Sequence, residues 1–375
     1  MGAEEQLILE IVCKVETGKL TRPEGQKLLQ ITARTLRRYL KDYREKGIGF
    51  IRHGNKGRAP KNKLAPELKS QVQELMKEKY FDFNMLHAME KLKEELGVEL
   101  KRETFRSWCH EIGMVKRAKR RRAIARFKRP RMGQAGLLIQ MDGSHHRWFG
   151  DRETCLIAAI DDATSEVVGA EFFEGETTFA CLKILKEIVS KKGIFKILYV
   201  DRAGLYGGIK RQGFSQVARS LEELGTQIIF ANSPEAKGRI ERLFQTLQDR
   251  LVAEMRLSKI RTIEQANDYL KNMYIPNQHN PRYMLLPHVP QPAWQPVATH
   301  INLEDVFCIK EYRLVGRDHT ISWGAERLMI AEAIKYSINR QRIEMRSHRP
   351  GQWQAYFAGK PIRLVKIEKL KKAVA

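Results

Sequence analysis

Residues 137–275 alternate between short apolar runs and amphipathic segments, and this pattern limits the possible folds of the chain more than any other feature. Apolar runs of about four to eight residues bounded by turn formers are typical of strands, whereas apolar residues recurring every three or four positions are typical of helices. The order of these segments predicts strand, strand, strand, helix, strand, helix, strand and helix. We therefore expect an α/β domain with a mixed sheet covered by helices.

Two helical units are predicted before this domain, in residues 1–48 and 66–115. In the first unit, Thr21 and Thr32 are N-cap candidates for a short helix and a basic amphipathic helix. This arrangement suits a helix-turn-helix, whose last helix enters the major groove of DNA. A small helical bundle with a solvated basic face is the alternative. The basic residues expected to bind DNA in these units are Arg34, Arg37, Arg38, Lys41, Arg102 and Arg106.

Charge is distributed unevenly along the chain. Residues 1–136 hold 33 Lys and Arg against 17 Asp and Glu, residues 137–275 hold 19 of each, and residues 276–375 hold 16 against 8. A neutral centre is therefore flanked by two basic arms. This partition predicts that the arms hold a polyanion, such as double-stranded DNA, which is acted on in the centre.

The highest density of positive charge lies in residues 116–131, which contain ten basic residues and no acidic one. Because like charges repel, we expect this segment to be extended or disordered without DNA and to act as a DNA tether. A nuclear localisation signal is the competing interpretation. The residues expected to bind DNA here are Lys116, Arg117, Lys119, Arg120, Arg121 and Arg122.

The remaining segments complete a multidomain arrangement. Regions rich in Gly, Pro, Lys or Gln predict linkers, and five short runs near the C-terminus predict the strands of a small β-barrel. The predicted boundaries are 1–48 and 66–115 for the helical units, 49–65, 116–136 and 276–302 for linkers, 137–275 for the α/β core and 303–375 for the barrel.

Composition argues against several other classes of protein. No apolar run reaches the roughly 18 to 20 residues needed to span a bilayer, and the acidic start is wrong for a secretory signal. The five cysteines are scattered and never spaced as CxxC, which argues against a disulfide framework or a Cys-rich zinc site. We therefore expect a cytoplasmic protein with no membrane partner.

Two aspartates follow apolar runs of the predicted core. Asp142 follows LLIQM and Asp201 follows ILYV, so each is expected to close a strand. A carboxylate in the middle of a strand would be buried at a cost of several kcal/mol unless it were paired. Clustered carboxylates bind hard cations such as Mg²⁺, and two such ions can assist the attacking and leaving oxygens of phosphoryl transfer. Capping aspartates are the alternative, and a turn-forming role is expected for Asp161 and Asp162.

A third carboxylate comes from the segment FANSPEAKGRIERLFQTL. Glu235 is explained by a helix that starts at Ser233 and Pro234, where a negative charge offsets the helix dipole. Glu241 instead borders the buried stripe of the helix and can reach the ends of the strands, so it is preferred. The neighbouring residues expected to contact phosphates are Lys237, Arg239 and Arg242.

Histidine and aromatic residues follow Asp142 closely. His145 and His146 are near enough to touch DNA, but loop positions with ordinary hydrogen bonds are expected. Trp148 is suited to stack on a displaced base, but a role in plugging a hairpin is expected.

The order of elements, with QMDGS, YVDRAG and ANSPEAKGRIERLFQTLQDRL, resembles the DDE transposases and integrases of the retroviral-integrase superfamily. The resemblance is strongest to bacterial insertion-sequence transposases of the ISNCY type and covers essentially the whole chain. It implies an RNase H-like integrase core, N-terminal helix-turn-helix units and a small C-terminal barrel. Carried over by position, the catalytic and metal-binding triad falls on Asp142, Asp201 and Glu241.

The resemblance implies a DNA transposase that hydrolyses a phosphodiester at the end of its element and transfers the 3′-hydroxyl into target DNA. We expect two Mg²⁺ ions, with Mn²⁺ able to substitute, and at least a dimer because two element ends must be joined. The alternatives are a catalytically inactive or domesticated DNA-binding protein and an RNase H-like nuclease. The zinc site often found ahead of such cores is not matched, since only Cys13 and Cys109 precede Asp142.

Overall fold

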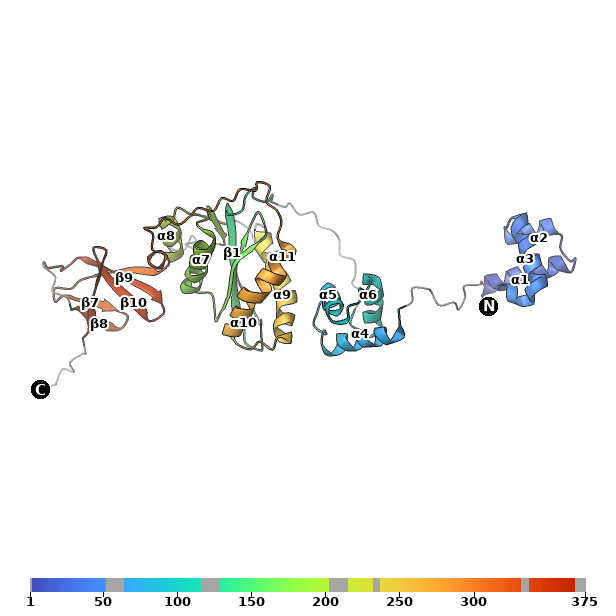
Figure 1. Ribbon diagram of the computed structural model, residues 1–375, viewed down its shortest axis with the longest axis horizontal. Coiled ribbons are helices and arrows are strands. Elements are labelled where there is room, and N and C mark those ends of the chain that lie inside the picture. The colour runs from blue at the N-terminus through green and yellow to red at the C-terminus, as the bar shows by residue number, and fades with distance from the viewer. Residues whose placement is uncertain are drawn as a thin grey trace. The chain divides into compact units, whose positions relative to one another are not determined.

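The computed structural model describes residues 2–51, 64–115, 129–201, 215–231, 237–331 and 337–367 (Figure 1). The chain divides into two compact units, Met1–Val72 and Gln73–Ala375. In the described ranges, no helix combines the length and the apolar character needed to cross a bilayer.

Three helices and a short 3-10 segment begin the first unit. They are α1 (Ala3–Glu16), α2 (Arg22–Leu29), α3 (Ala33–Lys46) and η1 (Gly47–Ile51). Thr21 accepts a hydrogen bond from the backbone of Glu24, and Thr32 accepts one from the backbone of Thr35, which confirms both predicted N-caps. Buried Leu36 on α3 packs in the small core of this bundle. The helix-turn-helix assignment stays a prediction.

Three further helices follow: α4 (Pro66–Glu78), α5 (Met85–Leu96) and α6 (Arg102–Glu111). Asn84 caps α5 at its start, and Gly97 ends it with φ of 66°, a left-handed conformation that glycine adopts without strain. Phe105 and Trp108 are the buried aromatic residues of α6. The basic residues of α6 therefore lie outside its apolar face.

The core has the predicted order of strands and helices. It comprises β1 (Leu138–His146), β2 (Thr154–Asp161), β3 (Val167–Phe173), α7 (Thr178–Lys192), β4 (Ile197–Val200), α8 (Gln216–Glu223), β5 (Gln227–Phe230) and α9 (Gly238–Leu257). The five strands form one sheet in the order β3-β2-β1-β4-β5. The pairs among β1, β2 and β3 are antiparallel, whereas β1 pairs with β4, and β4 with β5, in parallel. The predicted mixed sheet is confirmed.

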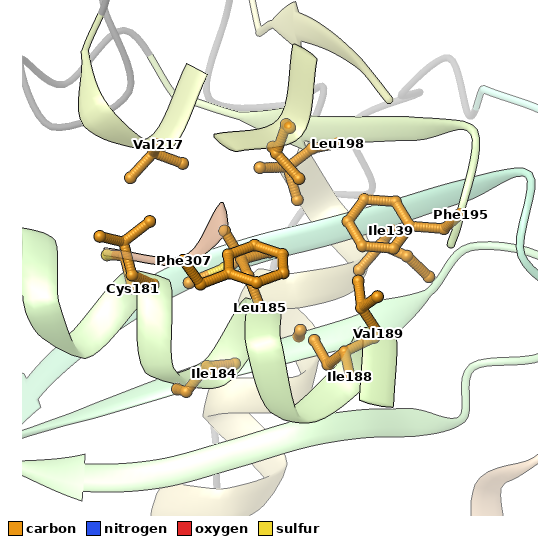
Figure 2. Close-up of a cluster of buried hydrophobic side chains, with 14 of the residues drawn as sticks. Ile139, Cys181, Ile184, Leu185, Ile188, Val189, Phe195, Leu198, Val217 and Phe307 are labelled. Carbon is orange, nitrogen blue, oxygen red and sulfur yellow. The ribbon is translucent and has the colours of Figure 1, made fainter. Parts of the chain in front are cut away.

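Both faces of this sheet are buried by helices, and α7 and α9 flank β1 in Figure 1. Figure 2 shows the cluster on the α7 side, where Ile139 and Leu198 of the sheet pack with Leu185 of the helix. On the α9 side, Leu156 of β2 packs in a second cluster with Leu247. Burial on both sides explains why β2 is apolar along nearly its whole length rather than alternating.

Helices α10 (Ile263–Tyr269), η4 (Leu270–His279) and α11 (Asn280–Tyr283) follow α9. Residues 276–283, where the sequence predicts a linker, are thus helical, with Pro276 inside the π-helix η4. The Asn280 side chain accepts from the backbone N–H of Val167 at 3.0 Å and donates to its carbonyl at 3.2 Å. These bonds continue the ladder of the edge strand β3 and hold α11 against the sheet.

The C-terminal part contains α12 (Leu303–Val306) and seven strands. These are β6 (Ile309–Leu314), β7 (Thr320–Trp323), β8 (Glu326–Ile330), β9 (Arg342–Arg349), β10 (Gln352–Phe357), β11 (Lys360–Ile362) and β12 (Leu364–Lys366). They form two sheets, in the orders β11-β10-β9-β6 and β12-β8-β7, around one shared apolar cluster. No closed barrel is found in the described residues, because the strand pairing falls into two separate sets. The predicted barrel is not confirmed.

His279 at the end of η4 makes the stability of the core depend on pH. It is buried between the rings of Tyr274 and Tyr283, and burial, aided by the charge of Arg250, lowers its pKa to about 4. The unfolded chain binds a proton below about pH 6.5 that the folded chain does not bind. Stability is therefore lost as the pH falls from about 6.5 towards 4.

We predict that His279→Gln removes part of this acid sensitivity. Between pH 7 and pH 5 the variant should lose about 1 to 2 kcal/mol less unfolding free energy than the wild-type protein. Urea unfolding followed by circular dichroism measures the difference, and His145→Gln, at an exposed position, is the control. Equal losses in His279→Gln and wild type would show that His279 does not cause the dependence.

Candidate active site

The pairing of β1 with β4 brings two of the predicted carboxylates to the same level of the sheet. The parallel ladder ends with Gln140 opposite Tyr199. If the register continues by two residues, Asp142 lies opposite Asp201. Residues in register on neighbouring parallel strands point to the same face, so on this continued register both carboxylates would lie on one face of the sheet.

Asp142 does not close its strand, contrary to the sequence prediction. It is the fifth residue of β1, which continues to His146 because β2 pairs with it as far as Thr154. The parallel pairing with β4 stops earlier, and Asp201 directly follows β4 as predicted. Asp142 is thus paired with β2 in the antiparallel ladder but lies beyond the last residue of β1 that pairs with β4.

The electrostatics of Asp142 reflect this position. Burial raises the pKa of Asp142, and the nearby negative charge of Asp201 raises it further. Lys237 opposes the shift: its Nζ lies 2.8 Å from Asp142 Oδ2, and its side chain is only 7% exposed. The ammonium group neutralises part of the negative charge that the two strands bring together. The predicted contact of Lys237 with DNA stays a prediction.

Two hydrogen bonds fix which part of α9 faces Asp142. The backbone N–H of Ile240 donates to Gln140 Oε1 at 3.3 Å, and Gln248 Nε2 donates to Ser144 Oγ at 3.1 Å. Because side chains alternate along a strand, Asp142 shares a face with Gln140 and Ser144 and lies between them. Asp142 therefore faces the first turns of α9.

Glu241 lies in the first turn of α9, and its side chain is exposed. It precedes Gln248 by seven residues, about two helical turns, so both lie on the same side of the helix. Among the described residues, no group of three or more His, Cys, Asp or Glu side chains could hold a metal ion. The structure thus brings Asp142 near Asp201 and turns the start of α9 towards them, without gathering all three carboxylates.

The sequence predicts a helix start at Ser233 and Pro234, with Glu235 just inside it. The α-helix that the structure describes, α9, begins at Gly238, one residue after Lys237, which makes no side-chain cap. Ser233, Pro234 and Glu235 lie outside the described residues. The acidic residue in the first turn of α9 is Glu241, where a negative charge interacts favourably with the helix dipole.

Two further predicted residues have internal partners. Arg239, expected to contact phosphates, is 12% exposed and pairs with Asp162 at 2.7 Å, whereas Arg242 is exposed. Asp161 accepts hydrogen bonds from the backbone of Thr164, which confirms its turn-forming role. Asp162 does not form the turn with its side chain but pairs with arginine instead.

The residues after Asp142 have mainly structural positions. His145 is an exposed residue of β1, with Nδ1 3.9 Å from a carboxylate oxygen of Glu153, and His146 packs edge-on against Trp148. Trp148 is fully buried, and its Nε1 donates to the carbonyl of Ser144. The predicted role of Trp148 as a hairpin plug is confirmed, and both histidines lie on the strand rather than in a loop.

The predicted DNA-binding residues of the helical units are exposed. Those of α3 are Arg34, Arg37, Arg38 and Lys41, and those of α6 are Arg102 and Arg106. The residues predicted in the basic segment, Lys116, Arg117, Lys119, Arg120, Arg121 and Arg122, lie outside the described residues. Contact with DNA stays a prediction for all of them.

Comparison with known proteins places the chain in a family. It is 33% identical over 334 residues to a Sinorhizobium fredii protein described as a transposase, y4bF, covering 86% of this chain and 72% of that protein. The chain belongs to the transposases. This transposase is also 31% identical over 300 residues to the transposase for insertion sequence IS1202 of Streptococcus pneumoniae, covering 69% of the chain and 64% of the relative. No family model matches the chain.

Two solved structures with partial likeness to the transposase are a viral intasome and a viral integrase catalytic core. The match to a chain of the simian T-cell lymphotropic virus intasome covers 78% of this chain and 99% of the viral chain, with 14% identity and a TM-score of 0.36. The match to the HTLV-2 integrase catalytic core in complex with magnesium covers 39% of this chain and 93% of the viral chain, with 14% identity and a TM-score of 0.30.

Sequence patterns missed two features of the transposase core, the structural role of Gln140 and the ion pair of Lys237 with Asp142. Gln140 is a polar residue inside an apolar strand and is fully buried. Buried polar groups need hydrogen-bond partners, so its position in LLIQM is the signal that indicates a structural bond. No local signal identifies Asp142 as the partner of Lys237, since 95 residues separate them.

We predict that Lys237→Met destabilises the metal-free transposase by about 1 to 3 kcal/mol, because Asp142 is left part-buried beside Asp201 without its cation. Urea unfolding in EDTA measures the loss, and Lys237→Arg, which keeps the charge, is the control. The double variant Lys237→Met with Asp142→Asn should recover part of the lost stability. Strictly additive losses in the double variant would contradict the proposed ion-pair coupling.

Proposed function

We propose that this transposase cuts and joins DNA at a metal-dependent site formed by Asp142, Asp201 and Glu241. The observation that carries the proposal is the parallel register of β1 and β4 up to Gln140 and Tyr199, which, continued by two residues, would align the two aspartates on the face turned towards the start of α9. Glu241 is the acidic residue of that first turn. We propose that the three carboxylates act as the site of a DDE-type polynucleotidyl transferase on an RNase H-like core.

The chemistry of the donors fits a divalent metal. Carboxylate oxygens are the ligands that Mg²⁺ prefers, and the contact of Asp142 with the Lys237 ammonium indicates that the site favours a cation. We propose two Mg²⁺ ions, with Mn²⁺ as a substitute. When bound, they would activate the attacking oxygen and stabilise the leaving oxygen of a phosphodiester.

The chain's own residues would position the DNA for two successive reactions. In the first, water attacks a phosphodiester at the end of the element and releases a 3′-hydroxyl. In the second, that hydroxyl attacks a target phosphate in line and displaces a second 3′-oxygen. Lys237, released from Asp142 when the carboxylates bind metal, would be free to contact a phosphate. No covalent intermediate between protein and DNA is required.

The flanking regions would hold the double-stranded DNA. We propose that residues 1–48 and 66–115 bind element ends as helix-turn-helix units and that residues 116–136 act as a basic tether. Residues 303–375 would supply the second basic arm. Since two element ends must be joined, we propose at least a homodimer.

We predict that Asp142→Asn, Asp201→Asn and Glu241→Gln each lower metal-dependent cleavage and strand transfer by at least about 1,000-fold. This corresponds to about 4 kcal/mol of lost transition-state stabilisation. The substrate is a labelled duplex from the DNA that flanks the gene, assayed with Mg²⁺, with Mn²⁺ and with EDTA. Binding to this duplex should be retained, because the substitutions remove no basic residue.

Glu235→Gln is the matched control for Glu241→Gln and should keep wild-type activity. Loss of activity in Glu235→Gln but not in Glu241→Gln would move the third carboxylate to Glu235. Wild-type protein that binds the duplex but never cleaves it would support an inactive DNA-binding protein. Cleavage without strand transfer or sequence preference would support an RNase H-like nuclease.

The basic tether generates a separate prediction about salt. Replacing Arg120, Arg121 and Arg122 together by alanine should reduce the slope of log affinity against log salt by about 0.9 for each phosphate that is no longer neutralised, or about 2.7 in all. Fluorescence anisotropy over a salt series measures the slope, with exposed Arg261→Ala as the control. An unchanged slope in the triple variant would show that the segment does not contact phosphates.

A further inference from the structure

Asp162 joins three segments of the core that are distant in sequence. It directly follows β2 and is fully buried. Its Oδ1 accepts from Arg129, from Arg239 Nη1 at 2.7 Å and from Gln140 Nε2 at 2.8 Å. Its Oδ2 accepts from the backbone N–H of Met132 at 2.9 Å. A buried carboxylate with this many donors is fully satisfied, so each donor is held in a defined place.

The bond to Asp162 also orients the side chain of Gln140. An ionised carboxylate only accepts hydrogen bonds, so the amide nitrogen of Gln140 must face Asp162. The amide oxygen then points to α9, where it accepts from the backbone N–H of Ile240 at 3.3 Å. Through Gln140, Asp162 therefore satisfies one of the free N–H groups at the start of the helix.

Tertiary contacts rather than a local cap hold this helix start. Lys237, the N-cap residue, makes no side-chain capping bond. Arg239 is attached to Asp162 and also donates to the carbonyl of Arg129 at 3.0 Å, while Ile240 is attached to Gln140. Both attached residues immediately precede Glu241. The position of Glu241 relative to the sheet thus depends on contacts that converge on Asp162.

We propose that Asp162 is a positioning residue for the transposition reaction. It holds the first turn of α9 at the level of Asp142 on β1, through Arg239 directly and through Gln140 indirectly, and so sets the place of Glu241. The inference rests on the proposed function, because it assigns importance to the place of Glu241. Asp162 is not itself one of the proposed metal ligands.

The geometry separates this role from simple stabilisation. Asp161, its neighbour, is equally buried, but its carboxylate accepts from the backbone N–H groups of Gly136, Ala163 and Thr164 and from the hydroxyl of Thr164. These three partners lie before β1 or in the turn after β2, away from α9 in the sequence. Asp161→Asn is therefore a matched control, since it alters a buried carboxylate at the end of the same strand without touching the helix start.

The experiment compares Asp162→Asn, Gln140→Leu and Asp161→Asn in the full chain. Rates of cleavage are measured per folded molecule, below the melting temperature of each variant, together with KM for the duplex. Hydrogen exchange of the first turn of α9 is measured without metal or DNA, and Mn²⁺ binding by calorimetry without DNA.

Asp162→Asn and Gln140→Leu should each lower kcat by about 10- to 100-fold with little change in KM, since a misplacement of about 1 Å can cost about 100-fold. Both should also speed hydrogen exchange at Ile240 and weaken Mn²⁺ binding. Asp161→Asn should leave kcat, exchange at Ile240 and Mn²⁺ binding unchanged. Gln140→Leu leaves the pair of Asp162 with Arg239 intact, so it tests positioning even if Asp162→Asn fails to fold.

Equal kcat, exchange and Mn²⁺ binding in Asp162→Asn, Gln140→Leu and Asp161→Asn would overturn the inference. If Asp142→Asn were inactive in the same series, the proposed function would stand while the positioning role failed. If Asp142→Asn kept full activity, the proposed function would fail. Separately, unchanged exchange at Ile240 in Asp162→Asn and Gln140→Leu would show that Asp162 does not hold the start of α9.

Discussion

The parallel register of β1 with β4 sets the electrostatic condition on which the rest of the core depends. Continued by two residues, it would align Asp142 with Asp201 on one face of the sheet; burial and the nearby charge of Asp201 raise the pKa of Asp142. A cation is needed there, and Lys237 provides one from the residue before α9. The start of α9 is thereby attached to the same strands that hold the aspartates.

A second set of contacts, which converge on Asp162, also holds the start of α9. Asp162, itself buried, gathers Arg129, Arg239 and Gln140, and Gln140 reaches the backbone of α9. Charged side chains near the site therefore bind one another. Residues 137–275 are neutral overall because 19 acidic residues balance their 19 basic ones.

Membership of the transposases agrees with the distribution of charge. A neutral α/β core lies in sequence between two strongly basic regions, and the exposed basic residues of α3 and α6 lie on helices whose apolar faces are already buried. Phosphate binding is mainly electrostatic, so exposed basic residues of this kind are consistent with the proposed role of these regions in holding DNA.

The sequence by itself determined the order of strands and helices in the core, the N-caps at Thr21 and Thr32 and the position of Asp201 after β4, because these depend on local apolar periodicity and local hydrogen bonds. The family, too, was evident from sequence motifs. Only the tertiary structure decided that Asp142 lies within its strand, since the length of β1 depends on its pairing with β2. It likewise decided which partners Lys237, Arg239 and the backbone of Ile240 have, because those contacts join residues about 75 to 100 positions apart, beyond the reach of any local pattern.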